Sequence, residues 1–297
     1  MKRPNFFIVG AGGCGTTALY QYLNEHPEIY MSEIKEPNYF GRDSSFKTEA
    51  EYLGLFAGAK NEIRLGEATP LYLRSPRATE AIYKFDPNAK IIIMLRDPVS
   101  LMLSSYWRNR LTGRERSPTF KEALAKQAGK TKADRDEPPI YRSLPLLTEH
   151  VQRYFKRFGR MNVYVIIFDD FKQDTAAVYK RALDFLGVDV DFKTKFHVVN
   201  AHKQIRSQAI QKIFLATGLD IPRLKRSKMA RRLNRILPKS IVEIPLSLLR
   251  IIYMREQPKP QVDPELKRQL EAEFVQEIER LGNLLGRNLC HWCGKSL

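Results

Sequence analysis

Cysteine is scarce in this chain of 297 residues, in which only three occur. Three cysteines cannot form a disulfide framework, and the C-x-x-C pair Cys290 and Cys293 supplies only half of a four-cysteine zinc site. We therefore expect free thiols, no metal centre and a reducing compartment.

Long apolar runs are also lacking. None reaches the roughly 18 residues that a membrane-spanning helix needs. The first strand-like segment begins at Asn5, which leaves no room for a secretory signal peptide. Together with the cysteine usage, these absences predict a cytoplasmic protein.

Acidic residues are few relative to basic ones. The chain has 33 Asp and Glu against 50 Lys and Arg, a formal charge of +17. Such an excess implies an anionic partner, which could be a nucleotide, an acidic glycan, a nucleic acid or a membrane surface.

The most informative stretch is NFFIVGAGGCGTTALYQYL, from Asn5 to Leu23. An apolar run of strand length (5–9) leads into a segment with four glycines (10–15), and helical spacing follows from Thr16. Glycines let backbone N–H groups approach a phosphate closely, and a helix N-terminus directs its dipole at that charge. The hydroxyls of Thr16 and Thr17 add two donors, so we expect an anion site here.

Two nucleotide templates fit this loop. Gly10, Gly12 and Gly15 satisfy the dinucleotide fingerprint G-x-G-x-x-G, with Glu33 or Glu36 downstream. The same glycines fit the P-loop pattern, except that a threonine stands where a triphosphatase has its lysine. The loop alone does not choose between them.

Strand and helix patterns alternate over the first two thirds of the chain. We expect an α/β fold with a P-loop-like, doubly wound parallel sheet flanked by helices. The expected strands are 5–9, 28–31, 63–67, 90–95 and 163–168. The expected helices are 76–85, 101–110, 144–158 and 174–186, besides the one beginning at Thr16.

The last third of the chain is different. Arg223–Lys239 is basic without a single acid, and a final helix begins at Asp263-Pro264. Its predicted inward stripe is Leu266, Leu270, Phe274, Ile278, Leu281 and Leu285. We expect one domain over 1–297, with a nucleotide-binding core (1–200) and a basic helical C-terminal part (201–297). The polar segment Gly113–Pro139 is expected to be a mobile excursion.

Chemically useful residues follow several predicted strands. Lys35 and Glu36 precede Pro37, Glu67 ends another strand, and Arg96 follows the apolar strand KIIIML. The carboxyl ends of parallel strands share one edge of the sheet, where ligands bind. Arginine suits a phosphate because its planar fork binds two oxygens at once.

These residues together resemble the sulfotransferase family that uses 3′-phosphoadenosine-5′-phosphosulfate (PAPS), particularly its carbohydrate and heparan branch. Gly15-Thr16-Thr17 matches the end of the family loop P-K-x-G-T-T. Arg96-x-Pro98, with Ser104 eight residues after the arginine, matches the family's R-x-P and serine. The segments KEPNYF, GEATPLYL and FDDF are also similar to segments of the glycan branch.

The resemblance implies transfer of a sulfuryl group from PAPS to a hydroxyl or amine, and the branch that it resembles favours a carbohydrate acceptor. It implies Glu36 as the general base with Glu67 second, and a 3′-phosphate held by Arg96 and Ser104. The residues implied to hold the 5′-phosphate are Gly12, Gly13, Cys14, Gly15, Thr16 and Thr17.

One departure from the family pattern is chemically important, because Gly13 stands where the family has its loop lysine. Another cation must then neutralise charge at the leaving group, or transfer is slow or absent. Lys35 is nearest in sequence, and Lys203 or Arg206 is a second source near the nucleotide.

Two other functions remain open. An NAD(P)-dependent Rossmann oxidoreductase would explain the glycines, but not Arg96 with Ser104. A non-catalytic protein would bind an acidic glycan through Arg223–Lys239, where aromatic residues are too sparse for single-stranded nucleic acid. The same segment with the apolar 241–254 would suit peripheral contact with a membrane surface.

Overall fold

The computed structural model describes residues 2–42, 44–130, 140–197, 203–205, 254–256 and 262–294. The chain divides into two compact units. The first comprises Met1–Ser104, Arg142–Val199 and Glu265–Leu297, and the second comprises Ser105–Tyr141 and Asn200–Pro264. Among the described residues, no helix has both the length and the apolar character to cross a membrane.

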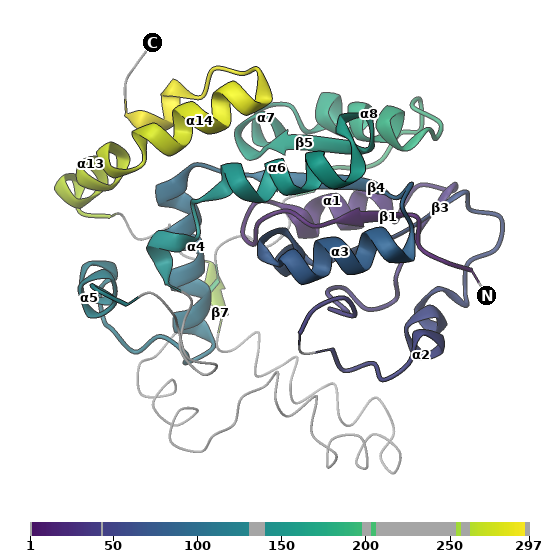
Figure 1. The fold of residues 1–297 in the computed structure, drawn as a ribbon, viewed down its shortest axis with the longest axis horizontal. Coiled ribbons are helices and arrows are strands. Elements are labelled where there is room, and N and C mark those ends of the chain that lie inside the picture. The colour runs from purple at the N-terminus through teal and green to yellow at the C-terminus, as the bar shows by residue number, and fades with distance from the viewer. Residues whose placement is uncertain are drawn as a thin grey trace. The chain divides into compact units, whose positions relative to one another are not determined.

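A five-stranded parallel sheet forms the centre of the first unit, in the order β2-β3-β1-β4-β5 (Figure 1). Its strands are β1 (Phe6–Ile8), β2 (Ile29–Met31), β3 (Arg64–Ala68), β4 (Lys90–Leu95) and β5 (Val163–Ile167). All five predicted strands are present, and the parallel α/β fold is confirmed.

Helices follow the strands, most of them where the sequence pattern predicts, whereas the short helices over 49–53 and 168–173 were not predicted. They are α1 (Thr16–Leu23), α2 (Glu49–Leu53), α3 (Pro76–Phe85), α4 (Pro98–Leu111), α6 (Leu147–Phe158), α7 (Phe168–Gln173) and α8 (Thr175–Leu186). Short 3-10 turns are η1 (Gly54–Phe56), η2 (Pro70–Arg74), η3 (Tyr141–Ser143) and η4 (Arg160–Asn162). The side chain of Asp174 caps α8 by accepting from the Ala177 amide, and Gly187 ends it at φ +67°.

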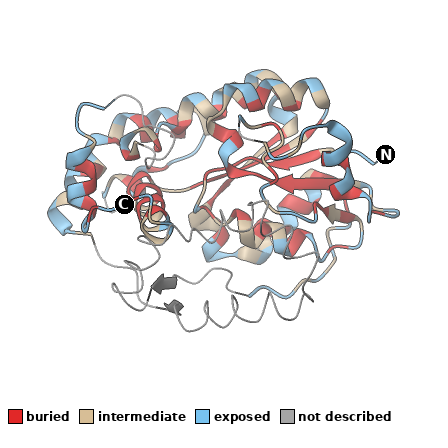
Figure 2. Cartoon of the chain, turned by 90° about the horizontal axis from the view of Figure 1, so that it is seen from below, coloured by how far each residue is buried: buried red, intermediate tan, exposed pale blue. Residues whose placement is uncertain are grey.

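The strands of the sheet are mostly buried (Figure 2), and burial is complete along the interior strands β1 and β4. Every residue of β1 and every residue of β4 after Lys90 has 0% exposure. Helices on both faces exclude water from these strands, which explains why KIIIML is apolar without alternation.

Strands β1 and β4 stay close beyond their ends. The Val9 amide donates to Ile92 O at 2.9 Å and the Ala11 amide to Met94 O at 3.0 Å. A Cβ on Gly10 would lie 2.0 Å from the Met94 nitrogen, so only glycine fits there. The chain after β1 crosses to β2, whereas β4 begins the other half of the sheet. The loops after β1 and β4 therefore flank the topological switch point.

The second unit contains α5 (Phe120–Lys126) and an antiparallel pair, β6 (Lys203–Ile205) with β7 (Met254–Glu256). Buried Glu115 accepts from the Tyr141 hydroxyl at 3.0 Å and from the Ser117 amide at 2.7 Å. Helix α5 was not predicted, because we expected an excursion over 113–139. Residues 131–139 and the basic segment 223–239 lie outside the described residues.

The predicted final helix is two helices, α13 (Pro264–Glu273) and α14 (Val275–Leu285), followed by η5 (Cys290–Cys293). The chain bends at Phe274, whose φ of −100° and ψ of 7° are not helical. The middle of the predicted stripe is buried: Leu270, Phe274, Ile278 and Leu281. This stripe lies within the first unit, which also contains the sheet, and the expected division of the chain at residue 200 stays a prediction.

Glu277 on α14 connects the C-terminal helices to α6. Its carboxylate, 7% exposed, accepts from the Thr148 amide at 2.8 Å and pairs with Arg280 at 3.2 Å. The side chain of the N-cap residue, Leu146, makes no capping hydrogen bond to α6. Glu277 instead accepts from one of the backbone amides that have no partner within the helix at its start.

Replacing Glu277 with alanine should therefore lower the free energy of unfolding by about 1–2 kcal/mol, because a partly buried amide loses its acceptor. Glu279→Ala, on the exposed side of the same helix, is the matched control and should change it by less than about 0.5 kcal/mol. Urea unfolding followed by circular dichroism measures both. Equal losses for the two variants would contradict the capping role.

Candidate nucleotide and sulfuryl-transfer site

The glycine loop after β1 leaves a helix N-terminus open to an anion. Gly13 and Gly15 have φ of +89° and +87°, which favour glycine. Gly15 is the N-cap of α1, where no side chain caps the helix and no acid lies in the first turn. The free amides and the helix dipole together attract negative charge.

Arg96, which follows β4, lies against this loop. Its Nη1 donates to Gly13 O at 3.2 Å, and its guanidinium lies 4.8 Å from the centre of the Phe168 ring. A Cβ on Gly15 would approach the same ring within 3.0 Å. Residues that follow β1, β4 and β5 thus meet at one edge of the sheet, and the predicted proximity of Arg96 to the loop is confirmed.

The Arg96 side chain is 13% exposed and has unused hydrogen-bonding capacity. Its Nε is buried with no hydrogen-bond acceptor among the described residues. Asp97 Oδ2 is 3.7 Å away, which is an ion-pair distance but too long for a hydrogen bond. Instead, Asp97 caps α4 by accepting from the Ser100 amide at 2.8 Å. A buried donor without an acceptor fits a site that binds an anion.

Ser104, two turns into α4, is packed against Gly13. A Cβ on Gly13 would lie 2.2 Å from Ser104 Oγ and 2.9 Å from Ser104 Cβ. Any residue with a side chain at this position would have to displace the serine. Its backbone would also have an unfavourable φ. The close contact with α4 gives a physical reason why no lysine stands at Gly13.

The loop after β2 carries the predicted base. Lys35 Nζ donates to Glu36 Oε1 at 2.6 Å, and the Glu36 side chain is 50% exposed. Glu36 and Asn38 are the non-glycine residues with positive φ in the described chain, at +60° and +55°. Each costs on the order of 1–3 kcal/mol, and such strain persists only where surrounding contacts enforce it.

This loop extends across the end of β3 toward β1. The Glu36 amide donates to Ala68 O at 3.1 Å, and the Thr69 amide donates to Ile8 O at 3.0 Å. Glu36 is therefore tied to the strand that neighbours the glycine loop, although β2 itself is at the edge of the sheet.

Glu67, the second candidate base, is completely buried at the end of β3. It accepts from the hydroxyls of Tyr52 at 2.8 Å, Thr69 at 2.7 Å and Tyr72 at 3.2 Å. Burial raises the pKa of Glu67 to about 7, although the three hydroxyls oppose that rise. A carboxylate enclosed in this way cannot contact a hydroxyl or amine of a substrate that comes from solvent.

The other predicted residues lie in the glycine loop or in the last third of the chain. Gly12, Cys14, Thr16 and Thr17 lie in the loop and the first turn of α1, with the Cys14 side chain buried. Lys203 lies in β6 of the second unit, and Arg206 lies outside the described residues, so both remain predictions. Phe168 belongs to the FDDF segment but was not among the predicted site residues.

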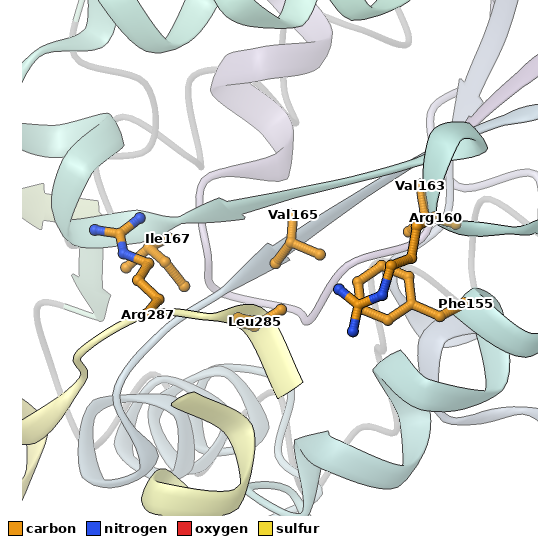
Figure 3. A pocket seen from close by; sticks show the side chains of 7 residues that line it. All are labelled: Phe155, Arg160, Val163, Val165, Ile167, Leu285 and Arg287. Carbon is orange, nitrogen blue, oxygen red and sulfur yellow. The ribbon is translucent and has the colours of Figure 1, made fainter. Parts of the chain in front are cut away.

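A separate cavity of about 200 Å³ lies beside β5 (Figure 3). Its lining residues are Phe155, Arg160, Val163, Val165, Ile167, Leu285 and Arg287. None of the predicted site residues lines it. Arg287 already pairs with Asp170 at 2.5 Å, and Arg160 donates to Leu284 O at 2.9 Å. This cavity is therefore separate from the predicted site residues that follow β1, β2, β3 and β4.

The family model described as "Sulfotransferase domain" matches residues 3–217. The chain belongs to the sulfotransferase family. The solved sulfotransferase from Alicyclobacillus acidocaldarius is 28% identical, with a TM-score of 0.71 over 98% of this chain and 99% of that one. The resemblance drawn from the sequence is thus confirmed, and an oxidoreductase is not supported.

Curated relatives match shorter parts. Mouse heparan sulfate glucosamine 3-O-sulfotransferase 6 is 28% identical over 202 residues, which are 68% of this chain and 57% of the relative. The membrane-associated sulfotransferase kil1 of Dictyostelium discoideum is 36% identical over 105 residues, 35% of this chain and 22% of the relative. Human carbohydrate sulfotransferase 15 is 31% identical, with 27% of its length covered. The chain thus spans between about a fifth and three fifths of these relatives.

The packing of Gly13 on Ser104 can be tested with Gly13→Ala. We expect it to lower the free energy of unfolding by about 1–3 kcal/mol more than Gly129→Ala does. Gly129 has a φ of +77° but open space around it, so its variant measures backbone strain without the steric conflict. Chemical denaturation measures both, and equal losses would show that Ser104 does not constrain the loop.

Proposed function

We propose that this protein transfers a sulfuryl group from PAPS to a hydroxyl or amine of a carbohydrate. The observation that carries the proposal is the contact of Arg96 with the Gly13 carbonyl, beside the open N-terminus of α1. Two anion-binding groups from different strands therefore lie together, which suits a nucleotide with phosphates at two positions.

The residues present fit such a nucleotide. The amides of the glycine loop, with the hydroxyls of Thr16 and Thr17, would hold the 5′-phosphate. Arg96 and Ser104 would hold the 3′-phosphate, which would supply the acceptor that the buried Arg96 Nε lacks. A dinucleotide without a 3′-phosphate would leave that donor unsatisfied.

We propose Glu36 as the general base that removes the proton from the acceptor. Bound PAPS supplies an activated sulfuryl group whose bond to the 5′-phosphate oxygen breaks as the acceptor oxygen or nitrogen bonds to sulfur. Glu36 takes the acceptor's proton, because its carboxylate is exposed and sits on a fixed, strained loop. Glu67 is not proposed as the base because it is enclosed.

Lys35 is the cation that we propose in place of the missing loop lysine. Lys35 lies on the same loop as the proposed base. Its ammonium nitrogen is 2.6 Å from Glu36 Oε1. A cation near the bridging oxygen would stabilise the charge that develops there, an effect typically worth on the order of 10²–10³ in rate.

A carbohydrate acceptor is favoured by the named relatives. Those that match this chain include a heparan sulfate glucosamine 3-O-sulfotransferase and a carbohydrate sulfotransferase. The formal charge of +17 is also compatible with an acidic glycan.

Arg96→Ala should weaken binding of 3′-phosphoadenosine-5′-phosphate roughly 10- to 100-fold, because charge-assisted hydrogen bonds to a phosphate are lost. Arg77→Ala, an exposed arginine on α3, is the control and should leave the dissociation constant unchanged. Isothermal titration calorimetry measures both, with NADH as a second ligand. Binding of NADH in preference to the bisphosphate would overturn the nucleotide assignment.

Glu36→Gln should lower sulfuryl transfer by roughly 10²–10⁴, because the amide cannot accept the proton. The assay measures radioactive sulfur transferred from labelled PAPS to de-O-sulfated heparan sulfate. Glu33→Gln, an exposed residue before Lys35, is the matched control and should retain the wild-type rate. Affinity for the bisphosphate should be the same in both variants. Full activity of Glu36→Gln would remove Glu36 as the base.

A further inference from the structure

The carboxylate of Glu67 is surrounded by hydroxyl donors from three places in the chain. Tyr52 on α2 and Tyr72 on η2 donate to Oε1, at 2.8 and 3.2 Å, and Thr69 donates to Oε2 at 2.7 Å. Glu67 has 0% exposure, and no cation pairs with it among the described residues. Burying a carboxylate is costly, so the cluster must provide something that a neutral residue would not.

Two of these hydroxyls also accept hydrogen bonds from the loop that carries Glu36. The Phe40 amide donates to Tyr72 Oη at 3.2 Å, and the Asn38 amide donates to Thr69 Oγ1 at 3.4 Å. A hydroxyl has one proton and two lone pairs, and an ionised carboxylate only accepts. Glu67 therefore fixes the direction of both hydroxyls, whose lone pairs are left for the loop amides.

The held segment is the strained part of the loop. Glu36 and Asn38 have positive φ. The amides of Asn38 and Phe40 donate hydrogen bonds to the hydroxyl oxygens of Thr69 and Tyr72. We propose that Glu67 is a positioning residue, which holds the strained loop through Thr69 and Tyr72 and so keeps Glu36 in place. The proposal rests on the proposed function only in assigning proton abstraction to Glu36.

Protonation of Glu67 would reverse part of this arrangement. A neutral carboxyl must donate one hydrogen bond, so one of the hydroxyls has to turn its own proton away from Glu67. The groups facing the carboxyl are the hydroxyls of Tyr52, Thr69 and Tyr72. Buried Tyr154, from α6, is also close enough for the charge of Glu67 to raise its pKa. None of these groups is a competing acid near neutral pH.

Activity and stability should then respond to pH in opposite directions. Because burial raises the pKa of Glu67 to about 7, the folded protein binds a proton more tightly than the unfolded chain does. This group therefore adds stability as the pH falls from about 7 toward the ordinary carboxyl range. Transfer activity should fall over the same interval, because the carboxylate that orients the hydroxyls is lost.

Hydrogen exchange tests the positioning role without any assay of activity. In Glu67→Gln, the amides of Asn38 and Phe40 should exchange about tenfold faster, as expected for the loss of one hydrogen bond. Peptides from the Gly10–Thr17 loop should be unchanged. Tyr52→Phe is the matched control, because Tyr52 donates to the same carboxylate but does not bond to the loop backbone. Unchanged exchange at Asn38 and Phe40 in Glu67→Gln would overturn the proposal.

If Glu67→Gln does not fold, Tyr72→Phe removes the bridge to Phe40 alone, and the Phe40 amide should exchange about tenfold faster. Slow exchange of Phe40 in that variant would also overturn the proposal. Circular dichroism and thermal unfolding establish that each variant is folded.

The pH profile of kcat, with labelled PAPS and de-O-sulfated heparan sulfate, is the second readout. Wild-type kcat should fall about tenfold per pH unit below about pH 7. Glu67→Gln should have a lower, flat kcat over that range and an unchanged dissociation constant for the bisphosphate. An unaltered slope in Glu67→Gln would overturn the proposal. If the wild type transfers no sulfur to any acceptor, the proposed function fails, whereas the exchange result decides the positioning role separately.

Discussion

The site depends on the close backbone approach of β1 to β4. Gly10 allows the chain beyond β1 to lie against the Met94 backbone, and the Ala11 amide then bonds to Met94 O. This pairing carries the glycine loop along β4 to the point where Arg96 leaves the sheet. A side chain at Gly10 would separate the two strands and therefore also the loop from the guanidinium. The geometry of the candidate anion site is thus a consequence of strand packing as much as of the residues that line it.

A second layer of the site is polar and buried. Two of the three hydroxyls around Glu67, those of Thr69 and Tyr72, connect the end of β3 to the loop after β2, in addition to the hydrogen bond from the Glu36 amide to Ala68 O. Fully satisfied buried networks rigidify the groups that they contact, because any displacement leaves a polar atom without a partner. Rigid support of this kind is what a backbone with positive φ at Glu36 and Asn38 requires.

Most of the sheet could be predicted from the sequence, because apolar runs such as KIIIML occur only where both faces are covered. The grouping of Arg96 with the loop followed from parallel topology. Other features depend on contacts that no local pattern contains. The bend at Phe274 interrupts a continuous apolar stripe, and the enclosure of Glu67 comes from Tyr52 on a separate helix. Cytoplasmic localisation and a role for Arg223–Lys239 stay predictions.

Where the family has its loop lysine, this chain has a close contact between the glycine loop and α4. Ser104 occupies the space into which a side chain at Gly13 would extend, so the loop lies closer to α4 than a lysine would allow. Under the proposed function, the cation then has to come from a neighbouring loop, and Lys35 is already paired with Glu36. When Glu36 takes a proton it loses its negative charge, and the ammonium group loses its partner. Proton removal from the acceptor would therefore release the cation at the stage when negative charge grows on the leaving oxygen.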